Sequence, residues 1–179
     1  MMKKIVLAVL LASGLMAAGA QDYIGVSAGQ ATLDFRVKND TGTIGKADFK
    51  ETAYNFTLGH YYGEQGRVSA TYTYIDIGDD MKHSDAITFS YDFILPLGKM
   101  FALYAGPTVG YTRLEFDNGA DVDGIHYGAQ AGAIVRIVPK FEIEAGYRYL
   151  VETGSQTLAA RRVELDNIGL WYIGANFRF

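Results

Sequence analysis

Hydrophobic and polar residues alternate with a period of two along most of the chain after residue 20. From Ala86 to Phe93, for example, bulky apolar residues at odd numbers alternate with Ala, Thr, Ser and Asp at even numbers. Successive side chains of a β-strand point to opposite faces, so each such run predicts a strand with one apolar and one polar face. Eight strands are predicted in this way, at residues 23–35, 53–62, 67–77, 86–95, 101–116, 125–137, 141–151 and 163–179.

The connections between these predicted strands alternate between short and long. Tight turns are predicted at residues 63–66, 96–98 and 138–140, and longer polar loops at residues 36–52, 78–85, 117–124 and 152–162. Most of the strands have about ten residues or more, which is the length that a tilted strand needs to cross a bilayer. Together these features predict an all-β fold: an eight-stranded antiparallel up-and-down transmembrane β-barrel, with short turns at one end and long loops at the other.

The two faces differ in a way that favours a membrane barrel. A water-soluble lipocalin-type barrel would turn its apolar face inward and would need a charged outer surface, and a β-sandwich with one buried face is the other alternative. Here the residues of the polar face are mostly small and uncharged. They include the glycines Gly106, Gly110, Gly128, Gly132, Gly146 and Gly174. Aromatic residues such as Tyr147, Tyr149 and Trp171 fall on the apolar face, and such residues suit the boundary between lipid and water.

The first twenty residues have the pattern of a secretory signal peptide. Two lysines precede a continuous apolar segment, and Ala18 and Ala20 form a cleavage box that makes Gln21 the expected first residue of the mature protein. A short membrane anchor is the alternative, but the apolar segment is too short to span a bilayer comfortably. We therefore expect a signal peptide at residues 1–20 and one barrel domain at residues 21–179.

The composition excludes several classes of protein. The chain has no cysteine, which excludes a disulfide scaffold, a thiolate metal site and a cysteine nucleophile. Its net charge of −4 argues against general attraction to nucleic acid. The mean hydropathy of +0.04 averages an apolar face and a polar face, so it hides the membrane-facing pattern. After residue 20, no apolar run is long enough for a transmembrane helix.

The C-terminal segment resembles that of a known family. Residues 171–179 read WYIGANFRF, so apolar side chains alternate up to a terminal phenylalanine, and residues 144–150 read EAGYRYL. With the signal peptide and the alternating strands, the chain resembles the OmpA/OmpX-type small outer-membrane β-barrel family. The resemblance implies a Gram-negative outer-membrane location and a C-terminal signal that the barrel-assembly machinery reads. The residues that match this signal are Trp171, Ile173, Phe177 and Phe179.

Several charged residues fall on the predicted inner face. An eight-stranded barrel is filled by its own side chains, and buried charges are costly unless they are paired. We therefore predict ion pairs of Arg67 with Asp92 and of Arg136 with Glu142; the second follows because the 138–140 turn sets Ile137 opposite Phe141. A gated ion path is the alternative to this filled core. The expected lumen charge network consists of Arg67, Asp92, Arg136, Glu142, Glu144, Arg148 and Arg178.

We expect neither catalytic residues nor a metal or cofactor. The histidines His60, His83 and His126 are too scattered to suggest a metal cluster. The adjacent pair His83-Ser84 lies in a predicted loop, where no third group is oriented to complete a triad. The acidic loop at residues 117–124 offers oxygen ligands, but it has glycine at position 119, where an EF-hand needs a ligand.

The sequence therefore predicts an integral outer-membrane β-barrel protein with a structural or surface-interaction role, extracellular loops and a polar, side-chain-filled lumen. We expect a monomer that contacts outer-membrane lipid and lipopolysaccharide, the latter through basic loop residues such as Arg161 and Arg162, and an extracellular ligand for the loops. The alternatives, in order, are an adhesin or host-factor-binding protein, a narrow pore and a lipid A-modifying enzyme.

Overall fold

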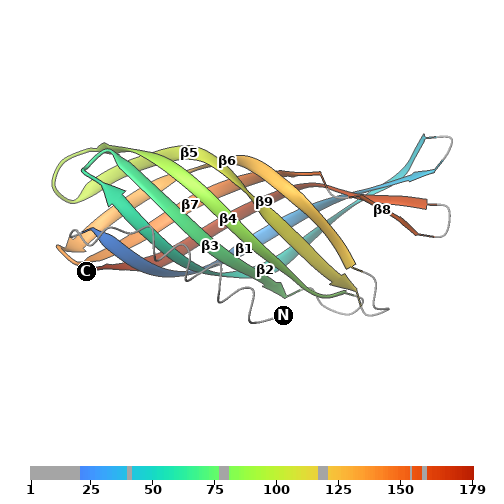
Figure 1. Cartoon of the computed structure of the whole chain (residues 1–179), viewed down its shortest axis with the longest axis horizontal. Coiled ribbons are helices and arrows are strands. Elements are labelled where there is room, and N and C mark those ends of the chain that lie inside the picture. The colour runs from blue at the N-terminus through green and yellow to red at the C-terminus, as the bar shows by residue number, and fades with distance from the viewer. Residues whose placement is uncertain (1–20, 40–41, 77–80, 117–120, 154, 159–160) are drawn as a thin grey trace.

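The computed structural model describes residues 21–39, 42–76, 81–116, 121–153, 155–158 and 161–179. Within these residues the chain forms nine β-strands (Figure 1). They are β1 (Asp22–Asn39), β2 (Gly42–Tyr62), β3 (Gly66–Asp76), β4 (Met81–Pro96), β5 (Phe101–Phe116), β6 (Asp121–Val138), β7 (Phe141–Glu152), β8 (Ser155–Leu158) and β9 (Arg161–Arg178). Among the described residues, no helix is long and apolar enough to cross a membrane.

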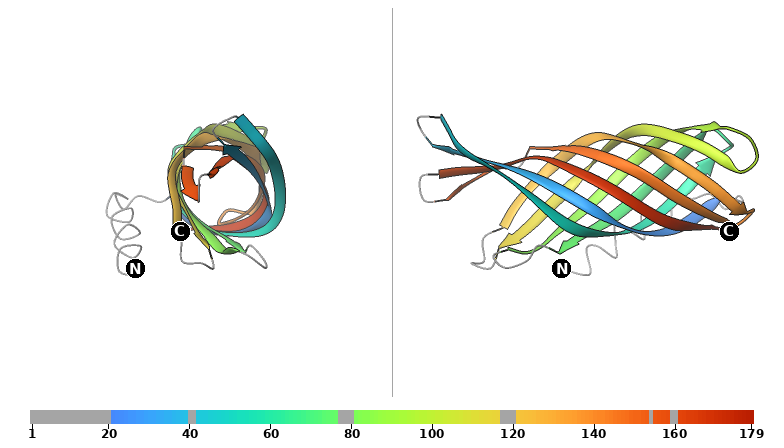
Figure 2. Two further views of the ribbon diagram at one scale, coloured as in Figure 1. Left: turned by 90° about the vertical axis from the view of Figure 1, so that its right-hand side faces the viewer. Right: turned by 180° about the vertical axis from the view of Figure 1, so that it is seen from behind.

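Eight of the strands close into an antiparallel barrel (Figure 2). Each strand from β1 to β6 pairs with the next along the chain, β7 pairs with β9, and β9 returns to pair with β1. In the described part of the chain, β8 pairs with β9 alone. Because the barrel is closed, the backbone N–H and C=O groups of each strand find hydrogen-bond partners on both neighbouring strands. No open sheet edge therefore has to face lipid. The predicted fold class is confirmed.

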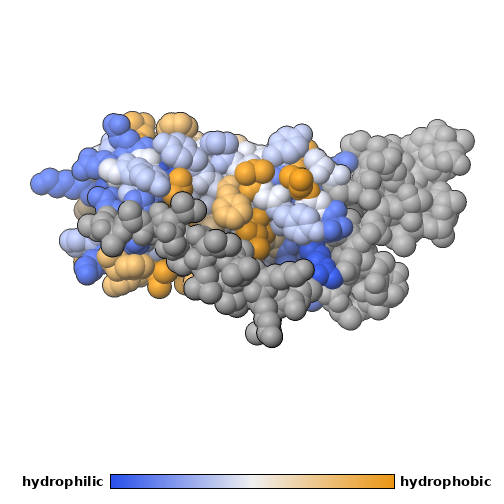
Figure 3. Space-filling view, in the orientation of Figure 1, coloured by the Kyte–Doolittle hydropathy of each residue, from blue (hydrophilic) through white to orange (hydrophobic). Residues whose placement is uncertain are grey.

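Outward and inward side chains alternate along the barrel strands. In β4, Phe89 and Phe93 are 49% and 64% exposed, whereas Thr88 and Asp92 are fully buried. In β7, every second residue is buried. On the face shown in Figure 3, hydrophobic residues are spread along the wall, and the most hydrophilic residues lie toward its two ends. This is the pattern of a wall that faces lipid on the outside and its own side chains on the inside.

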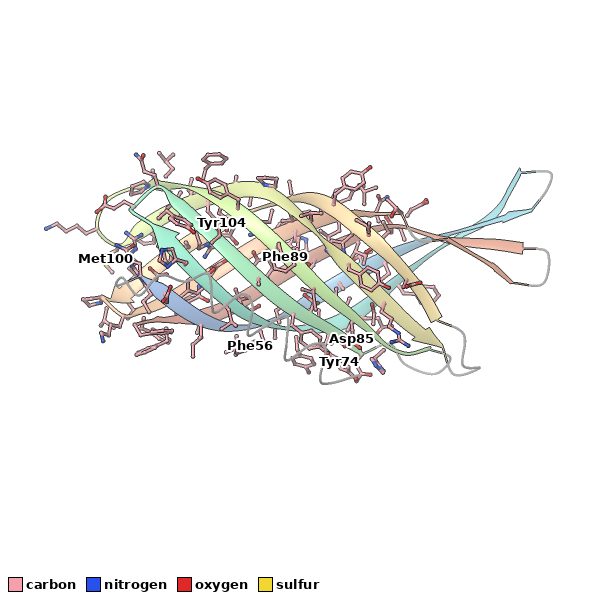
Figure 4. The ribbon with its side chains drawn as sticks, in the orientation of Figure 1. Phe56, Tyr74, Asp85, Phe89, Met100 and Tyr104 are labelled. Atoms are coloured by element: carbon pink, nitrogen blue, oxygen red, sulfur yellow. The ribbon has the colours of Figure 1, made fainter. Side chains whose placement is uncertain are left out.

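The barrel has a turn end and a loop end. Gly63 and Gly98 in the turns have φ angles of +66° and +117°, which glycine adopts more readily than other residues. Met100 lies at the turn end, whereas Tyr74 and Asp85 lie toward the loop end (Figure 4). The predicted tight turns are confirmed at the turn end, where residues 63–65, 97–100 and 139–140 separate consecutive strands.

The register at the β6–β7 turn differs from the prediction. Ile137 is not set opposite Phe141, because the ladder shifts between Arg136 and Val138 and it is Val138 that pairs with Phe141. Such a bulge adds one residue to one strand and leaves the pairing beyond it intact. Arg136 therefore still lies opposite Glu142, as predicted.

The prediction of long irregular loops is wrong in part, because the strands continue into them. The β1–β2 ladder runs on to the pair Asn39 and Gly42, and β8 pairs with the start of β9. Beyond a bilayer neither face of a strand has to be apolar, so the hydrophobic alternation ends before the backbone pairing does. Strand residues occupy parts of all the segments predicted as loops, 36–52, 78–85, 117–124 and 152–162.

Glycines on the inner face make room for large interior side chains. A Cβ atom on Gly146 would lie 2.2 Å from the Oη of Tyr104, and one on Gly110 would lie 2.4 Å from the Nε2 of His126. These distances are far shorter than ordinary van der Waals contacts. Gly110 and Gly146 therefore make room for rings that pack against the inside of the wall.

Candidate functional site

Inside the barrel a buried ion cluster surrounds Arg67, which is 1% exposed; we call it the central cluster. Arg67 on β3 lies directly opposite Asp92 on β4, and its Nη2 and Nε donate to Asp92 Oδ2 at 2.7 and 3.0 Å. On the other side, its Nη1 donates to Oε2 of Glu144 on β7 at 2.6 Å, and its Nη2 donates to Oε1 at 3.2 Å. One guanidinium fork thus joins two carboxylates from strands that are not neighbours.

Two amides and a second arginine extend this central cluster. Gln130 Nε2 donates to Asp92 Oδ1 at 2.8 Å, and Asn176 Nδ2 donates to Glu144 Oε2 at 2.8 Å. The Nε of Arg148 donates to Gln130 Oε1 at 2.9 Å. Among the described residues, no carboxylate lies within ion-pair distance of Arg148. The two arginines nevertheless balance the two carboxylates, so the cluster as a whole is neutral.

Tyrosine rings surround the central arginine. The Cζ of Arg67 lies 5.5 Å from the ring centre of Tyr23, 5.9 Å from that of Tyr61 and 4.7 Å from that of Tyr104. The hydroxyls of Tyr104 and Tyr172 are 2.6 Å apart. Ring faces attract a guanidinium more strongly when water is excluded. With Ile94, Ala102 and Ile134, the three rings around Arg67 form a buried layer.

Glu142 holds a second cluster together near the turn end. This fully buried carboxylate accepts hydrogen bonds on Oε1 from Arg136 Nε at 3.2 Å and from Arg178 Nη1 at 3.1 Å. Its Oε2 accepts from the Tyr61 hydroxyl at 2.6 Å. The side chains of both arginines are about one-fifth exposed, so this cluster borders water at the turn end. Both predicted ion pairs are present, and the structure places the predicted lumen charges in these two clusters.

The lumen is not polar throughout, contrary to the prediction. Apolar residues at inward positions of several strands form a separate layer inside the barrel, apart from the two charged clusters. Such side chains pack against one another without needing hydrogen-bond partners, so they close the interior at little cost. The layer consists of Ala31, Leu33, Ala53, Ile75, Leu150, Ile168 and Leu170, with Tyr172 packed against it.

A hydrogen-bonded chain runs through His126, whose side chain is fully buried. Thr112 Oγ1 donates to Glu152 Oε1 at 2.7 Å and also lies 2.8 Å from His126 Nδ1. A hydroxyl has one proton, so with Thr112 donating to Glu152 the Nδ1–H of His126 donates to Thr112. Thr88 Oγ1 lies 3.0 Å from Nε2 on the other side of the ring.

The sequence patterns did not single out this chain. The scattered positions of the histidines give no partner for His126, and Glu152 lies in a segment predicted as a loop. Extending the alternation of β7 by one inward position would have placed Glu152 inside, where it pairs in the ladder with His126. If the strand is lengthened in this way, the alternation of inward and outward residues predicts that Glu152 and His126 are neighbours inside the barrel.

The interior leaves little empty space near the central cluster. A cavity of about 20 Å³ lies there, and its walls include Arg148, Ser27 and Ser69. This volume is enough for one or two water molecules. The nitrogens of Arg148 that have no protein acceptor among the described residues are therefore suited to bonding with water in this cavity.

The candidate Ser/His pair is not brought together. His83 and Ser84 lie in β4 rather than in a loop, and they point to opposite faces of the wall. Ser84 is 1% exposed inside the barrel, whereas His83 stacks on Tyr74 outside, with ring centres 5.6 Å apart. Adjacent strand residues cannot share one site across the wall, so this pair cannot form a nucleophile and its base.

The histidines do not gather into a metal site. His60 Nδ1 lies 2.6 Å from Asp22 Oδ1 near the turn end, and His126 is held inside the barrel by threonines. Within the residues that the structure describes, no group of three or more potential metal ligands is found. The acidic segment 117–124 lies partly outside the described residues.

Tyrosine–aspartate pairs mark the loop end of the apolar outer surface. The Tyr72 hydroxyl donates to Asp85, and the Tyr111 hydroxyl donates to Asp123. Arg113 lies between the two aspartates in the strand ladder. Such a row suits the boundary between hydrocarbon and headgroups, because tyrosine has an apolar body and a polar tip.

The residues that match the family's assembly signal form an outward row on the last strand. Alternation places them on one face of β9 and at the residue after it. Of the cleavage box, Ala18 and Ala20 lie outside the described residues, and Gln21 is the first described residue. The exposed members of the outward row are Trp171, Ile173, Phe177 and Phe179.

Comparisons with known proteins agree with this architecture. Residues 5–179 match the model of a family described as the outer membrane protein beta-barrel domain. No curated protein matches the sequence. Among solved structures, Neisserial surface protein A is 18% identical, with a TM-score of 0.68 and 88% of this chain and 97% of that chain covered.

Two barrels of Pseudomonas aeruginosa are also similar to this chain. Outer membrane protein H is 26% identical with a TM-score of 0.60, covering 89% of this chain and all of that one. Outer membrane protein OprG is 16% identical with a TM-score of 0.61, covering 89% of this chain and 96% of that one. The resemblance to small outer-membrane barrels is confirmed. With the family model covering nearly the whole sequence, the chain belongs to the outer membrane protein beta-barrel domain family.

Proposed function

We propose that this outer-membrane barrel has a structural or surface-interaction role, in which a closed wall presents its loop-end hairpins outside the cell and its short turns in the periplasm. The observation that supports this role is the filled interior. The ion clusters and the apolar layer occupy the lumen, and the cavity between them measures about 20 Å³.

A narrow pore fits the same observation less well. An ion would have to pass buried apolar side chains such as Leu33 and Ile168, which cannot replace its hydration. It would also have to displace Arg67 from two carboxylates inside a low-dielectric interior. Each step opposes conduction, so a filled scaffold is the better-supported function.

Conductance measurements test this proposal. We expect the purified barrel to give no stepwise conductance in planar bilayers, because the ion clusters and the packed apolar side chains leave little room for a hydrated ion. The Arg148→Ala variant, which enlarges the central cavity, is expected to give the same result because the layer is unchanged. A heat-modifiable gel band serves as proof of folding for both proteins. Steady conductance of the wild type that vanishes in Arg148→Ala would overturn the proposal in favour of a gated pore.

The projecting hairpins favour an adhesin or host-factor-binding role within this proposal. β2, β1, β9 and β8 remain paired in that order toward the loop end, up to the pairs Asn39–Gly42 and Lys38–Arg162. The two hairpins extend past the other loop-end strands (Figure 1). Paired strands are already ordered before a ligand binds, so they lose less conformational entropy on binding than irregular loops do. An extended partner segment is one ligand that such a sheet edge recognises.

Shortening one hairpin tests the surface role. Arg36 and Lys46 are paired in the β1–β2 ladder, so residues 37–45 can be replaced by Asn-Gly to give a two-residue hairpin turn. We expect the barrel to fold normally and the cells to lose adhesion to immobilised host matrix and serum proteins. Replacing Glu64 and Gln65 in a short turn by Asn-Gly is the matched control, and it should leave adhesion unchanged. Full adhesion of the shortened variant would contradict the surface role.

We further propose lipopolysaccharide and the barrel-assembly machinery as partners. Lys50 on β2 is exposed toward the loop end, where lipid phosphates lie on this orientation. The outward apolar row that includes Trp171 and Phe179 is accessible on the last strand, as an assembly signal has to be.

A further inference from the structure

The outer wall over β5, β6 and β7 contains an apolar groove. Its floor consists of Ala105, Ala129 and Ala131, and its wall consists of Tyr147 and Tyr149; we call it the alanine groove. The groove has a volume of about 540 Å³. In the strand ladder Ala131 lies between Ala105 and Tyr147, so the floor and the wall are direct neighbours.

The depression follows from side-chain size at outward positions. The outward residues of β5 and β6 are small at this level, whereas the neighbouring β7 carries tyrosines and β4 carries Phe89 and Tyr91. The two aromatic residues of β4 border an adjoining depression with Pro107 and Val109. A groove that stays empty forfeits dispersion contacts on its floor and wall, so an occupant slender enough to fill it gains contacts that a flat wall does not offer.

The groove is open toward the turn end. Below Ala131, the next outward row consists of Leu103, Ala133 and Ala145, in which the two alanines continue the small floor between β6 and β7 and Leu103, 45% exposed, forms its edge on β5. Toward the loop end the next outward pair is Val109 with Tyr127, and both side chains are more than half exposed and raise the surface. A flexible chain can therefore enter from the leaflet at the turn end and is stopped near the middle of the wall.

Two lysines lie where the headgroup of such a chain would be. Lys99 precedes β5 and Lys140 precedes β7, both exposed in the turns, whereas the remaining turn carries Glu64. Ala131 lies seven residues before the end of β6 at Val138, about 18 Å along the barrel axis at the usual rise and tilt. One hydrocarbon leaflet is about 15 Å thick. An acyl chain that starts at the lysines and runs along the tilted strands therefore reaches the groove.

We propose that the alanine groove binds one acyl chain of an anionic phospholipid from the leaflet at the turn end, with its phosphate held by Lys99 and Lys140. A second barrel fits the groove less well, because two convex walls touch along a line and the tyrosines would hold the partner away from the alanine floor. The assignment of this leaflet to the periplasmic side rests on the orientation proposed above, but the binding itself does not depend on it.

Native mass spectrometry of the folded barrel in detergent, titrated with phosphatidylglycerol, tests the groove. We expect one lipid to remain bound to the wild type and to be lost from Ala131→Phe, whose ring fills the floor. Ala28→Phe, an outward substitution on β1 away from the groove, is the matched control and should retain the lipid. Equal retention by both variants would overturn the proposal, as would a dimer mass that disappears in Ala131→Phe. Heat-modifiable gel bands confirm that each variant is folded.

A charge-removal series tests the headgroup contact. Lys99→Gln and Lys140→Gln should each weaken phosphatidylglycerol binding by about fivefold, the usual effect of one lysine near an anionic lipid. Lys50→Gln at the loop end is the matched control and should have no effect, and binding of zwitterionic phosphatidylethanolamine should weaken less than that of phosphatidylglycerol. Unchanged phosphatidylglycerol binding in the Lys99→Gln/Lys140→Gln double variant would overturn the headgroup assignment.

Discussion

Replacing Arg67 by methionine is expected to lower the free energy of unfolding of the barrel by about 3–5 kcal/mol, because it leaves two buried carboxylates without their cation. Asp92 is fully buried and Glu144 nearly so, and both accept hydrogen bonds from the same guanidinium. Urea titration of the barrel folded in phospholipid vesicles, followed by the heat-modifiable gel band, measures the loss.

Two further variants show whether the unpaired charge is the cause. Arg136→Met should cost about 1 kcal/mol, since the Arg136 side chain is partly exposed and Glu142 keeps Arg178 and Tyr61 as partners. The triple variant Arg67→Met/Asp92→Asn/Glu144→Gln should regain much of the lost stability. If Arg67→Met costs no more than Arg136→Met, the central cluster does not stabilise the barrel in the way argued above.

Gly106→Ala is the second substitution expected to have a large effect. A Cβ atom at this position would lie 1.8 Å from the carbonyl oxygen of Tyr91 and 2.9 Å from the Cα of Asp92. Both are backbone atoms of the neighbouring strand, so they cannot move aside as a flexible side chain would. We expect a loss of about 3 kcal/mol or more, measured by the same urea titration, and a reduced yield of the heat-modifiable band on refolding.

Gly66→Ala provides a matched control at the start of β3. There the nearest atom to a new Cβ is the hydroxyl of Tyr91 at 3.2 Å, the end of an outward side chain that can adjust. This variant should change stability by less than about 1 kcal/mol. Equal losses for Gly66→Ala and Gly106→Ala would show that the backbone approach at Gly106 has no special importance.

The chemistry of the two faces explains why the barrel could be predicted from sequence. Lipid favours apolar side chains on the outer face, whereas the inner face accepts small and polar ones. Successive residues of a strand therefore alternate in polarity, and the strands can be recognised from this alternation alone. A short turn fixes the register of β6 and β7, which is why Arg136–Glu142 could be predicted as a pair. Arg67–Asp92 could be predicted because both residues face inward near the same end of neighbouring strands. Bulges such as the one before Val138 leave no signal in the alternation.

Other features depended on strand length, which alternation reports poorly. The paired hairpin around Asn39 and the inward position of Glu152 both lie beyond the point where the predicted strands ended. Outside the membrane a strand needs no apolar face, so its backbone pairing continues without a hydrophobic pattern. Because the predicted strand ended before Glu152, the hydrogen-bonded chain from Thr88 through His126 and Thr112 to Glu152 could not be predicted either.

The sequence by itself determined the strands, the two faces and the pairs between neighbouring strands, because these are local properties of a pleated backbone. Tertiary structure alone decided which residues meet across the lumen and which surface the wall presents to lipid. Arg67 contacts Glu144 although β3 and β7 are not neighbours, and the apolar layer assembles inward residues from several strands. The alanine groove likewise needs β5, β6 and β7 side by side. Closure and strand stagger set these contacts, and they are properties of the whole barrel rather than of any single strand.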